Sequence, residues 1–323
     1  MTKAIRIHEH GGPEVLRWED VEVGAPGPGQ VRVKHSAVGL NYIDTYQRSG
    51  LYPLELPLTL GMEGAGVVEE LGEGISGLAV GDRVAYPAPL GSYAEARLAP
   101  ADRMIKLPDG IEDRQAAAMM LQGLTVQYLI RQTHRVQAGE TVLFHAAAGG
   151  VGLIACQWLK HLGATVIGTV GSAEKAEFAK AHGCTHTINY REEDFVERVK
   201  ELTGGEGVPV VYDGVGKDTF EGSLQCIAPL GLMVTFGNSS GPVPAFELGR
   251  LAPLGSLFIT RPTLMTYSAK RADLEAMAAE LFEVVLSGAV KIEINQTYPL
   301  AETAQAHRDL EARKTTGSTV LLP

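Results

Sequence analysis

The sequence predicts an α/β protein in which a doubly wound parallel sheet follows a separate, mainly β domain. Three observations support this fold class. The chain has 323 residues, a length that favours two domains with separate cores. Up to about Pro108, short strand-like runs alternate with Gly and Pro clusters, whereas from Gly139 onward apolar β-rich segments alternate with helical ones.

The N-terminal region contains runs such as "QVRVKHSAV" and "AGVVEEL", separated by clusters such as "GAPGPGQ". Close-spaced short strands with this punctuation predict an antiparallel, barrel-like β region. A stretch rich in Ala, Met and Leu follows, from about Arg114 to Thr133. We expect a helical stretch here, forming the hinge between the domains.

The second region pairs "TVLFH" with "VGLIACQWLKHLG" and "TVIGT" with "SAEKAEFAKAHG", and the alternation continues to "SLFIT". This pattern predicts βαβ units and a buried parallel sheet. After about Arg261, a helix leads to short strands that end in "GSTVLLP", and we expect this segment to fold back onto the first domain. The predicted boundaries are residues 1–124, 125–262 and 263–323.

Composition excludes some classes of function. A formal charge of −10 and a pI near 5.4 argue against nucleic acid as a partner, because nucleic-acid binding needs clustered Lys and Arg. The three cysteines form no C-x-x-C pair, and this predicts neither a disulfide framework nor a thiolate-rich zinc site. With no predicted signal or spanning segment, we expect a cytoplasmic protein without a membrane partner.

The loop "HAAAGGVG" at residues 145–152 resembles a dinucleotide-binding G-x-G-x-x-G turn between a strand and a helix. Gly149 and Gly152 fill its second and third glycine positions, but Ala147 replaces the first. In a cofactor loop, the amides of Gly150 and Val151 would hold a pyrophosphate at the helix N-terminus. The alternative is a tightly packed turn without a ligand.

The end of the next strand, "TVGSAEK", bears on the choice of cofactor. NAD sites usually place Asp or Glu here for the ribose 2′-hydroxyl, but this chain has Gly171, Ser172 and Lys175 and no acid before Glu174. Ser172 could cap the helix and donate to a 2′-phosphate. The alternative, a capped surface helix with a solvated lysine, leaves the missing acid unexplained. The pattern therefore favours NADPH.

The run "GETVLFHAAAGGVGLIACQWLK" closely resembles the signature of quinone oxidoreductases and zeta-crystallins, zinc-independent members of the medium-chain dehydrogenase/reductase superfamily. That signature accepts Ala147. The resemblance continues in "GLNYIDTYQRSGLYP", "INYREEDF", "FGNSSG", "ITRPTL" and "LEARKTTGSTVLLP". It implies a Rossmann domain that binds NADPH and a GroES-like catalytic domain.

The resemblance also implies positions for the cofactor. The nicotinamide side would be Asn41, Tyr42, Ile43 and Asp44. The 2′-phosphate would meet Gly171, Ser172 and Lys175, with Tyr190 against the adenine. Further contacts would be Gly237, Asn238, Ser239, Pro262, Thr263, Tyr128, Val215 and Arg313.

The zinc enzymes of the superfamily have Cys where Asn41 stands and His where Met62 stands, and no cysteine precedes Cys156. Asn and Met would not make a competent Zn²⁺ site, so we expect no metal. Glu63 remains, and its plain interpretation is a structural carboxylate paired inside the fold.

Without a Lewis acid, an electron-poor conjugated acceptor is the expected substrate, because hydride addition to a quinone gives a stabilised phenolate. Candidate catalytic donors are Asn41, Tyr46, Arg48 and Tyr52, and Asp44 could orient Asn41 or the cofactor ribose, or merely cap a short helix. The favoured function is NADPH-dependent quinone reduction. Reduction of an activated C=C bond in an alkenal or enone stays open, as does a non-catalytic, crystallin-like or RNA-binding role. The resemblance further implies a homodimer through "GSLFIT". The physiological acceptor, the proton donor, and one- or two-electron transfer stay undecided.

Overall fold

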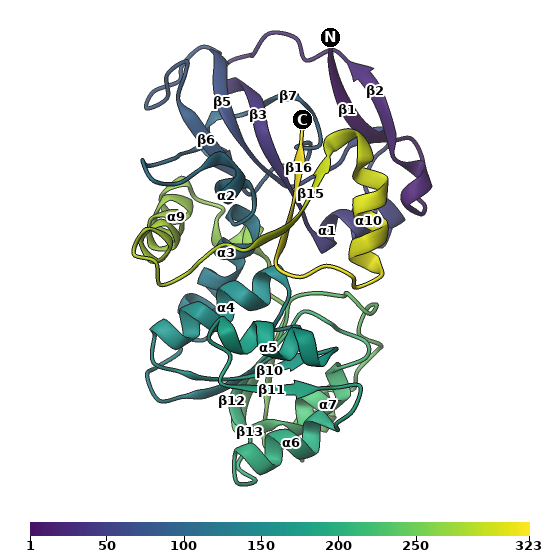
Figure 1. Cartoon of the computed structure of the whole chain (residues 1–323), viewed down its shortest axis with the longest axis vertical. Helices are drawn as coiled ribbons and strands as arrows, with labels where there is room; N and C mark the ends of the chain where they lie inside the picture. The colour runs from purple at the N-terminus through teal and green to yellow at the C-terminus, as the bar shows by residue number, and fades with distance from the viewer. The chain divides into compact units, whose positions relative to one another are not determined.

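A computed structural model describes residues 1–323, which form two compact units (Figure 1). Unit 1 contains Met1–Leu124, Tyr267–Leu286 and Ile292–Pro323, and unit 2 contains Thr125–Thr266 and Ser287–Lys291. None of the helices combines the length and the apolar character needed to cross a bilayer.

Unit 1 is built on two β-sheets. One has the strand order β2-β1-β4, and the other has the order β15-β16-β3-β5-β6-β8, with β7 also paired to β3. The strands are β1 (Thr2–Ile7), β2 (Arg17–Val21), β3 (Gln30–Leu40), β4 (Leu58–Thr59), β5 (Glu63–Leu71), β6 (Arg83–Tyr86), β7 (Ala96–Pro100), β8 (Ile105–Lys106), β15 (Ile294–Pro299) and β16 (Ser318–Leu322). Every pairing is antiparallel except β15 with β16. The C-terminal strand β16 pairs with β3, with Thr319 opposite Leu40.

The helices of unit 1 flank these sheets. They are α1 (Tyr42–Ser49), α2 (Asp113–Ala117), α9 (Arg271–Leu286) and α10 (Thr303–Glu311), together with the first part of α3 (Met120–Tyr128). Helix α1 follows β3 after a single residue, Asn41, and ends at Gly50, whose φ of 81° is the left-handed conformation that glycine adopts readily. The long strand β3 therefore fixes where the Asn41 loop begins.

The helical stretch predicted from about Arg114 to Thr133 is confirmed, but it is divided into shorter helices. The segment contains α2, then α3, then a π-helical turn from Leu129 to Thr133. The break after α2 leaves the backbone N–H of Leu121 outside the helical hydrogen bonds, and it donates to Glu63 Oε2 at 2.6 Å. The buried Glu63 carboxyl thus satisfies an N–H group in the first turn of α3, which has no partner within the helix.

Unit 2 is a six-stranded, wholly parallel sheet with the order β11-β10-β9-β12-β13-β14. Its strands are β9 (Thr141–Phe144), β10 (Thr165–Val170), β11 (His186–Asn189), β12 (Val208–Asp213), β13 (Ile227–Thr235) and β14 (Phe258–Thr260). Its main helices are α4 (Gly150–His161), α5 (Ala173–Ala181), α6 (Phe195–Leu202) and α7 (Phe220–Gln225). Counted along the unit, the order is 3-2-1-4-5-6, that of a Rossmann fold. The predicted fold class is confirmed.

The core of unit 2 lies between the sheet and its helices. Leu143, Ile167, Val211 and Met233, from four adjacent strands, are fully buried there. Because both faces of the sheet are covered, polar groups gather at the ends of its strands. In sheets of this type, ligands bind beyond the carboxyl ends of the strands, at the point where the strand order reverses, which here lies between β9 and β12.

Candidate active site

The sequence-predicted cofactor residues of unit 2 gather at one edge of the sheet. The loop containing Gly149, Gly150 and Val151 follows β9, Gly171 and Ser172 follow β10, and Tyr190 follows β11. Val215 follows β12, Gly237 follows β13, and Pro262 follows β14. Each set therefore lies just past the carboxyl end of its strand. Tyr128, which is buried in α3, and Arg313, which belongs to unit 1, stand outside this set.

The turn after β9 explains how the loop does without its first glycine. The positive φ, 56°, falls on Ala146 rather than on Ala147. Ala147 is fully buried, and a Cβ atom added to Gly168 of β10 would lie 2.6 Å from its Cβ. The methyl group of Ala147 thus fills space that the neighbouring strand leaves open, and the turn keeps its shape.

The same turn is built to bring backbone close to a ligand. A Cβ atom on Gly152 would lie 2.3 Å from Ala146 O, so only glycine fits where α4 packs on the loop. At Gly149 the nearest atom would be 3.3 Å away. Gly149 is the N-cap of the twelve-residue helix α4, and no side chain caps this end. The first amides of α4 are therefore suited to an anionic pyrophosphate.

The end of β10 carries a glycine, a serine cap and no acid before Glu174. Ser172 caps α5 by accepting the Lys175 N–H at 3.2 Å, as the sequence predicted. A Cβ atom on Gly171 would lie 2.5 Å from the Tyr190 hydroxyl, so glycine lets this tyrosine lie against the loop. The side chain of Tyr190 is exposed, as an adenine-stacking residue requires.

The loops after β12 and β13 are held by interactions that sequence reasoning missed. Asp213 Oδ1 accepts the N–H groups of Val215 (2.8 Å) and Gly216 (3.0 Å). Arg261 Nη1 donates to Thr235 Oγ1 and to Gly237 O, both at 3.0 Å. A local signal existed for Asp213 alone, since an acid that directly ends a buried strand often caps the next turn.

In unit 1, the Asn41 loop is anchored by a buried carboxyl. The backbone N–H of Asn41 donates to Asp44 Oδ2 at 2.8 Å, and the Tyr93 hydroxyl donates to the same oxygen at 2.7 Å. Asp44 is fully buried, and this burial raises its pKa to about 7 against the opposing effect of these hydrogen bonds. Asp44 is the N3 residue of a capping box with the N-cap residue Asn41, so it caps α1, one of the three roles the sequence suggested.

The side chain of Asn41 is held from both ends. Its Nδ2 donates to Glu63 Oε1 at 2.7 Å, and its Oδ1 accepts from Gln122 Nε2 at 3.1 Å. Ser318 Oγ in turn donates to Gln122 Oε1 at 2.8 Å. Burial raises the pKa of Glu63 to about 8, opposed by its two hydrogen bonds. The expected paired, structural role of Glu63 agrees with these contacts.

This corner of unit 1 does not fit a zinc ion. Asn41 is an amide already bonded to Glu63, and Met62 Sδ accepts a hydrogen bond from Gln47 Nε2 at 3.4 Å. No group of three or more His, Cys, Asp or Glu side chains is placed to hold a metal ion. The donor set offers one carboxylate, an amide and a thioether, which is not the Cys and His set that Zn²⁺ prefers.

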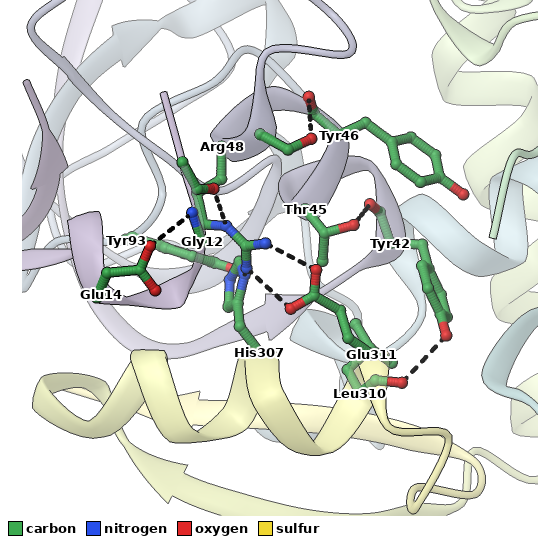
Figure 2. Close-up of polar contacts among 12 residues, drawn as sticks. Gly12, Glu14, Tyr42, Thr45, Tyr46, Arg48, Tyr93, His307, Leu310 and Glu311 are labelled. Atoms are coloured by element: carbon green, nitrogen blue, oxygen red, sulfur yellow. Dashed lines mark hydrogen bonds and ion pairs between the residues drawn. The ribbon is translucent and has the colours of Figure 1, made fainter. Parts of the chain in front are cut away.

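Arg48 requires a correction. The sequence suggested it as a donor to the substrate, but Figure 2 shows it buried against α10, bonded to His307 and Glu311. Its Nη1 lies 2.9 Å from His307 Nδ1, its Nη2 lies 2.7 Å from Glu311 Oε1, and its Nε donates to Gly11 O at 3.1 Å. A buried guanidinium must be paired, so Arg48 is a structural residue here.

The hydrogen bond from Arg48 fixes which atom donates at each link of a buried chain that runs through His307 and Tyr93 to Asp44. Arg48 can only donate, so His307 Nδ1 accepts and its Nε2 carries the hydrogen toward the Tyr93 oxygen, 3.2 Å away. Burial and the Arg48 charge lower the pKa of His307 to about 3, which keeps the ring neutral. Tyr93 then donates to Asp44. Sequence reasoning missed Tyr93 and His307, since nothing local relates residues this far apart in the chain.

The tyrosines of the Asn41 segment line up along α1 and its exit. The rings of Tyr46 and Tyr52 meet edge to face with centroids 5.4 Å apart, and the Tyr42 hydroxyl donates to Leu310 O at 3.0 Å. In Figure 2 the Tyr46 hydroxyl points away from the cluster around Arg48. The rings of Tyr46 and Tyr52 thus pack against each other at the end of α1.

Known proteins resemble this chain over its whole length. An alcohol dehydrogenase GroES-like domain model matches residues 27–109, and a zinc-binding dehydrogenase model matches residues 150–283. A quinone oxidoreductase of Pseudomonas aeruginosa is 57% identical over 325 residues, covering 100% of both chains. The chain belongs to the quinone oxidoreductase family. Although the second model is named for zinc binding, this chain has no set of side chains that fits a zinc ion.

Two further relatives sharpen the comparison with the quinone oxidoreductase family. The structure of Escherichia coli quinone oxidoreductase complexed with NADPH superimposes with a TM-score of 0.98 at 50% identity, covering 99% of this chain and 100% of that one. A 2-haloacrylate reductase of a Burkholderia species is 48% identical, covering 100% of this chain and 99% of its own. Relatives of this chain therefore carry both names, quinone oxidoreductase and 2-haloacrylate reductase.

Proposed function

We propose that this chain is an NADPH-dependent quinone reductase, a zinc-independent NADPH:quinone oxidoreductase. The observation that carries the proposal is the 57% identity, over the full length of both chains, to a protein named quinone oxidoreductase. The named NADPH complex at 50% identity supports the cofactor.

Each loop at the strand ends of unit 2 would hold one part of NADPH. The uncapped amides of Gly150 and Val151, beside Gly149, would bind the pyrophosphate. Gly171, Ser172 and Lys175 would bind the 2′-phosphate, with Tyr190 against the adenine. The remaining contacts we propose are Val215, Gly237, Asn238, Ser239, Pro262, Thr263, Tyr128 and Arg313.

When bound, NADPH supplies a hydride. The task of unit 1 is then to orient the reacting rings and to exclude water. Asn41, Tyr42, Ile43 and Asp44 would form the nicotinamide side, and the second hydrogen of Asn41 Nδ2 could donate to a developing phenolate oxygen. Tyr46 and Tyr52 would offer flat rings on which a quinone can stack.

The alternative substrate is an activated C=C bond, as in an alkenal or enone. One observation favours it, the 48% identity to a 2-haloacrylate reductase. Turnover of a naphthoquinone compared with a 2-alkenal, with NADPH and a chelator present, separates the two. We expect quinone turnover that the chelator leaves unchanged. Faster reduction of the alkenal would favour the alternative, and loss of activity with the chelator would contradict the zinc-free assignment.

We propose a homodimer through the edge of the unit 2 sheet. β14 is the last strand in the sheet order, and its Phe258 is 60% exposed. Leu230 is 69% exposed and Leu248 is 75% exposed. Exposed apolar side chains beside an unpaired strand edge suit pairing with a second copy. Light scattering on the wild type and on Phe258→Asp tests this, with a dimer expected for the first and a monomer for the second.

The remaining parts of the proposal concern partners, location and domains. A charge of −10 supports a protein that does not bind nucleic acid. We also propose that it works in the cytoplasm without a membrane partner. We propose a catalytic domain of residues 1–124, a nucleotide domain of 125–262 and a C-terminal return of 263–323. A salt-dependent gel shift with RNA would contradict the proposal that the protein does not bind nucleic acid.

A further inference from the structure

A chain of buried side chains runs across three adjacent strands of unit 2, directly beneath the predicted cofactor loops. Its members are Thr169 on β10, His145 after β9, Asp213 on β12 and Ser223 on α7. All four are at most 2% exposed. None of them was among the residues predicted from the sequence to contact the cofactor.

The hydrogen bonds of this chain are tightly defined. His145 Nδ1 lies 2.9 Å from Thr169 Oγ1, and His145 Nε2 lies 2.9 Å from Ser223 Oγ. Ser223 Oγ also lies 3.1 Å from Asp213 Oδ2. Each link is within hydrogen-bond distance. The imidazole therefore joins two hydroxyl groups that bond opposite nitrogens of its ring.

Only one assignment of hydrogens satisfies every link. Asp213 can only accept, so the Ser223 hydroxyl donates its single hydrogen to Asp213 Oδ2. The Ser223 oxygen therefore accepts from His145 Nε2. His145 Nδ1 then accepts from the Thr169 hydroxyl. Burial lowers the pKa of His145, so the ring is neutral and carries the one hydrogen that this arrangement needs.

Both ends of the chain reach backbone amides of cofactor loops. At one end, Thr169 Oγ1 accepts the Ala146 N–H at 3.3 Å, and Thr169 O accepts the Ala147 N–H at 3.0 Å. At the other end, Asp213 Oδ1 accepts the N–H groups of Val215 and Gly216. One imidazole thus connects the turn before the proposed pyrophosphate site to the loop that holds Val215.

We propose that His145 is a positioning residue that fixes these two loops relative to each other, so that both meet the cofactor in one arrangement. The inference rests on the proposed function for the identity of the ligand. Its physical basis is preorganisation, because loops already held in the bound geometry lose less conformational freedom when the ligand arrives. The ring is held edge to face against Phe195, with centroids 5.2 Å apart, which limits its rotation.

Two conservative variants break the chain on either side of the ring. Thr169→Val removes the hydroxyl at one end, and Ser223→Ala removes the hydroxyl at the other. Amide hydrogen exchange of the free protein is followed in the peptides 145–153 and 213–220. We expect Thr169→Val to speed exchange in 213–220 as well as in 145–153, and Ser223→Ala to speed exchange in 145–153 as well.

NADPH dissociation constants of the same proteins give a second readout. Each variant should raise the constant about tenfold, which corresponds to loss of one buried hydrogen bond. The double variant should also raise it about tenfold rather than a hundredfold, because either change disconnects the same two loops. Exchange changes confined to the peptide next to each substitution, together with multiplying effects on binding, would overturn the proposal.

The matched control is His35→Phe, a second buried, neutral histidine, which bonds Tyr86 and Ala94 within unit 1. It should lower the melting temperature without changing the NADPH constant or exchange in either peptide. A similar effect of this control on both readouts would overturn the proposal. A wild type that binds no NADPH would instead contradict the proposed function, and the exchange result would still decide the role of His145.

Discussion

The methyl group of Ala147 lies where a side chain on Gly168 would have to go, 2.6 Å from the position of its Cβ atom. The two residues sit on the loop after β9 and on the neighbouring strand β10. An alanine where the fingerprint has glycine is therefore matched by a glycine across the sheet. The missing first glycine is a change in packing that leaves the turn able to bind a ligand.

Gly168→Ala should lower the free energy of unfolding by about 1–3 kcal/mol, because the core has no room for the added carbon. Ala147→Gly in the same chain should restore part of this loss, and Cys184 Sγ, 2.5 Å from the same position, should prevent full recovery. Denaturant titrations measure both. Gly249→Ala is the control, since nothing lies within 4 Å of its added carbon. Strictly additive effects of the two substitutions would contradict this packing relationship.

Gly152→Ala and Gly149→Ala should fail in different ways. The first places a carbon 2.3 Å from Ala146 O, so it should lower both the melting temperature and the NADPH affinity. In the second, the added carbon lies 3.3 Å from Ala146 O, so the melting temperature should stay within a few degrees of the wild type. NADPH binding should weaken about tenfold or more, because the added carbon blocks close approach of the pyrophosphate. Thermal melts and titration calorimetry test the pair. Equal melting losses with unchanged affinity would argue against a pyrophosphate at this turn.

Ser172→Asp should reduce the preference for NADPH over NADH about tenfold or more. Aspartate caps α5 as well as serine does, but its charge repels a 2′-phosphate. Ser172→Asn is the matched control, because it caps without adding charge. The measurement is kcat/KM for both cofactors in all three proteins. Similar ratios for the Asp and Asn variants would place the 2′-phosphate elsewhere.

Glu63→Gln should cost about 1–3 kcal/mol at pH 6, because an amide NH₂ cannot accept from the N–H donor that it faces, whereas the hydroxyl oxygen of the protonated carboxyl still can. The pKa of Glu63 is raised from 4.5 to about 8 by burial, so the folded state holds the proton more tightly than the unfolded chain. The stability that this group contributes is lost as the pH rises toward 8, by at most about 1.4 kcal/mol per pH unit.

The gap between wild type and Glu63→Gln should therefore narrow from pH 6 to pH 9. Asp44 shifts in the same direction, but it is present in both proteins and largely cancels. Urea unfolding at four pH values measures the gap, with the exposed Glu283→Gln as control. A gap that stays constant with pH would show that Glu63 is ionised throughout this range, and a gap that widens would also contradict the raised pKa.

The sequence was sufficient to predict the fold class and the glycine-containing turn after β9, because both depend on local patterns. Alternating apolar segments set the parallel sheet, and Gly149, Gly152 and Ser172 follow strands at short, regular spacing. The parallel order of the sheet then brings their loops to one edge. For this reason, residues that were proposed separately came to lie together.

The buried polar contacts could not be predicted in the same way. Arg48 and His307 are 259 residues apart, and Asn41 and Gln122 are 81 apart, so no periodicity connects either pair. Arg48 was mistaken for a substrate donor because a surface role is the usual one for arginine, and burial is visible only in the fold. The break within the helical stretch from Arg114 to Thr133 could not be predicted for a related reason, since the carboxyl that accepts the Leu121 N–H belongs to β5, far back in the chain.

The most direct test of the central claim is the rate of naphthoquinone-dependent oxidation of NADPH and of NADH by the wild-type protein. The proposal predicts quinone turnover, with kcat/KM for NADPH at least about tenfold above that for NADH, as the loss of one charged contact to the 2′-phosphate would give. No turnover with quinone, or equal use of NADH, would contradict it.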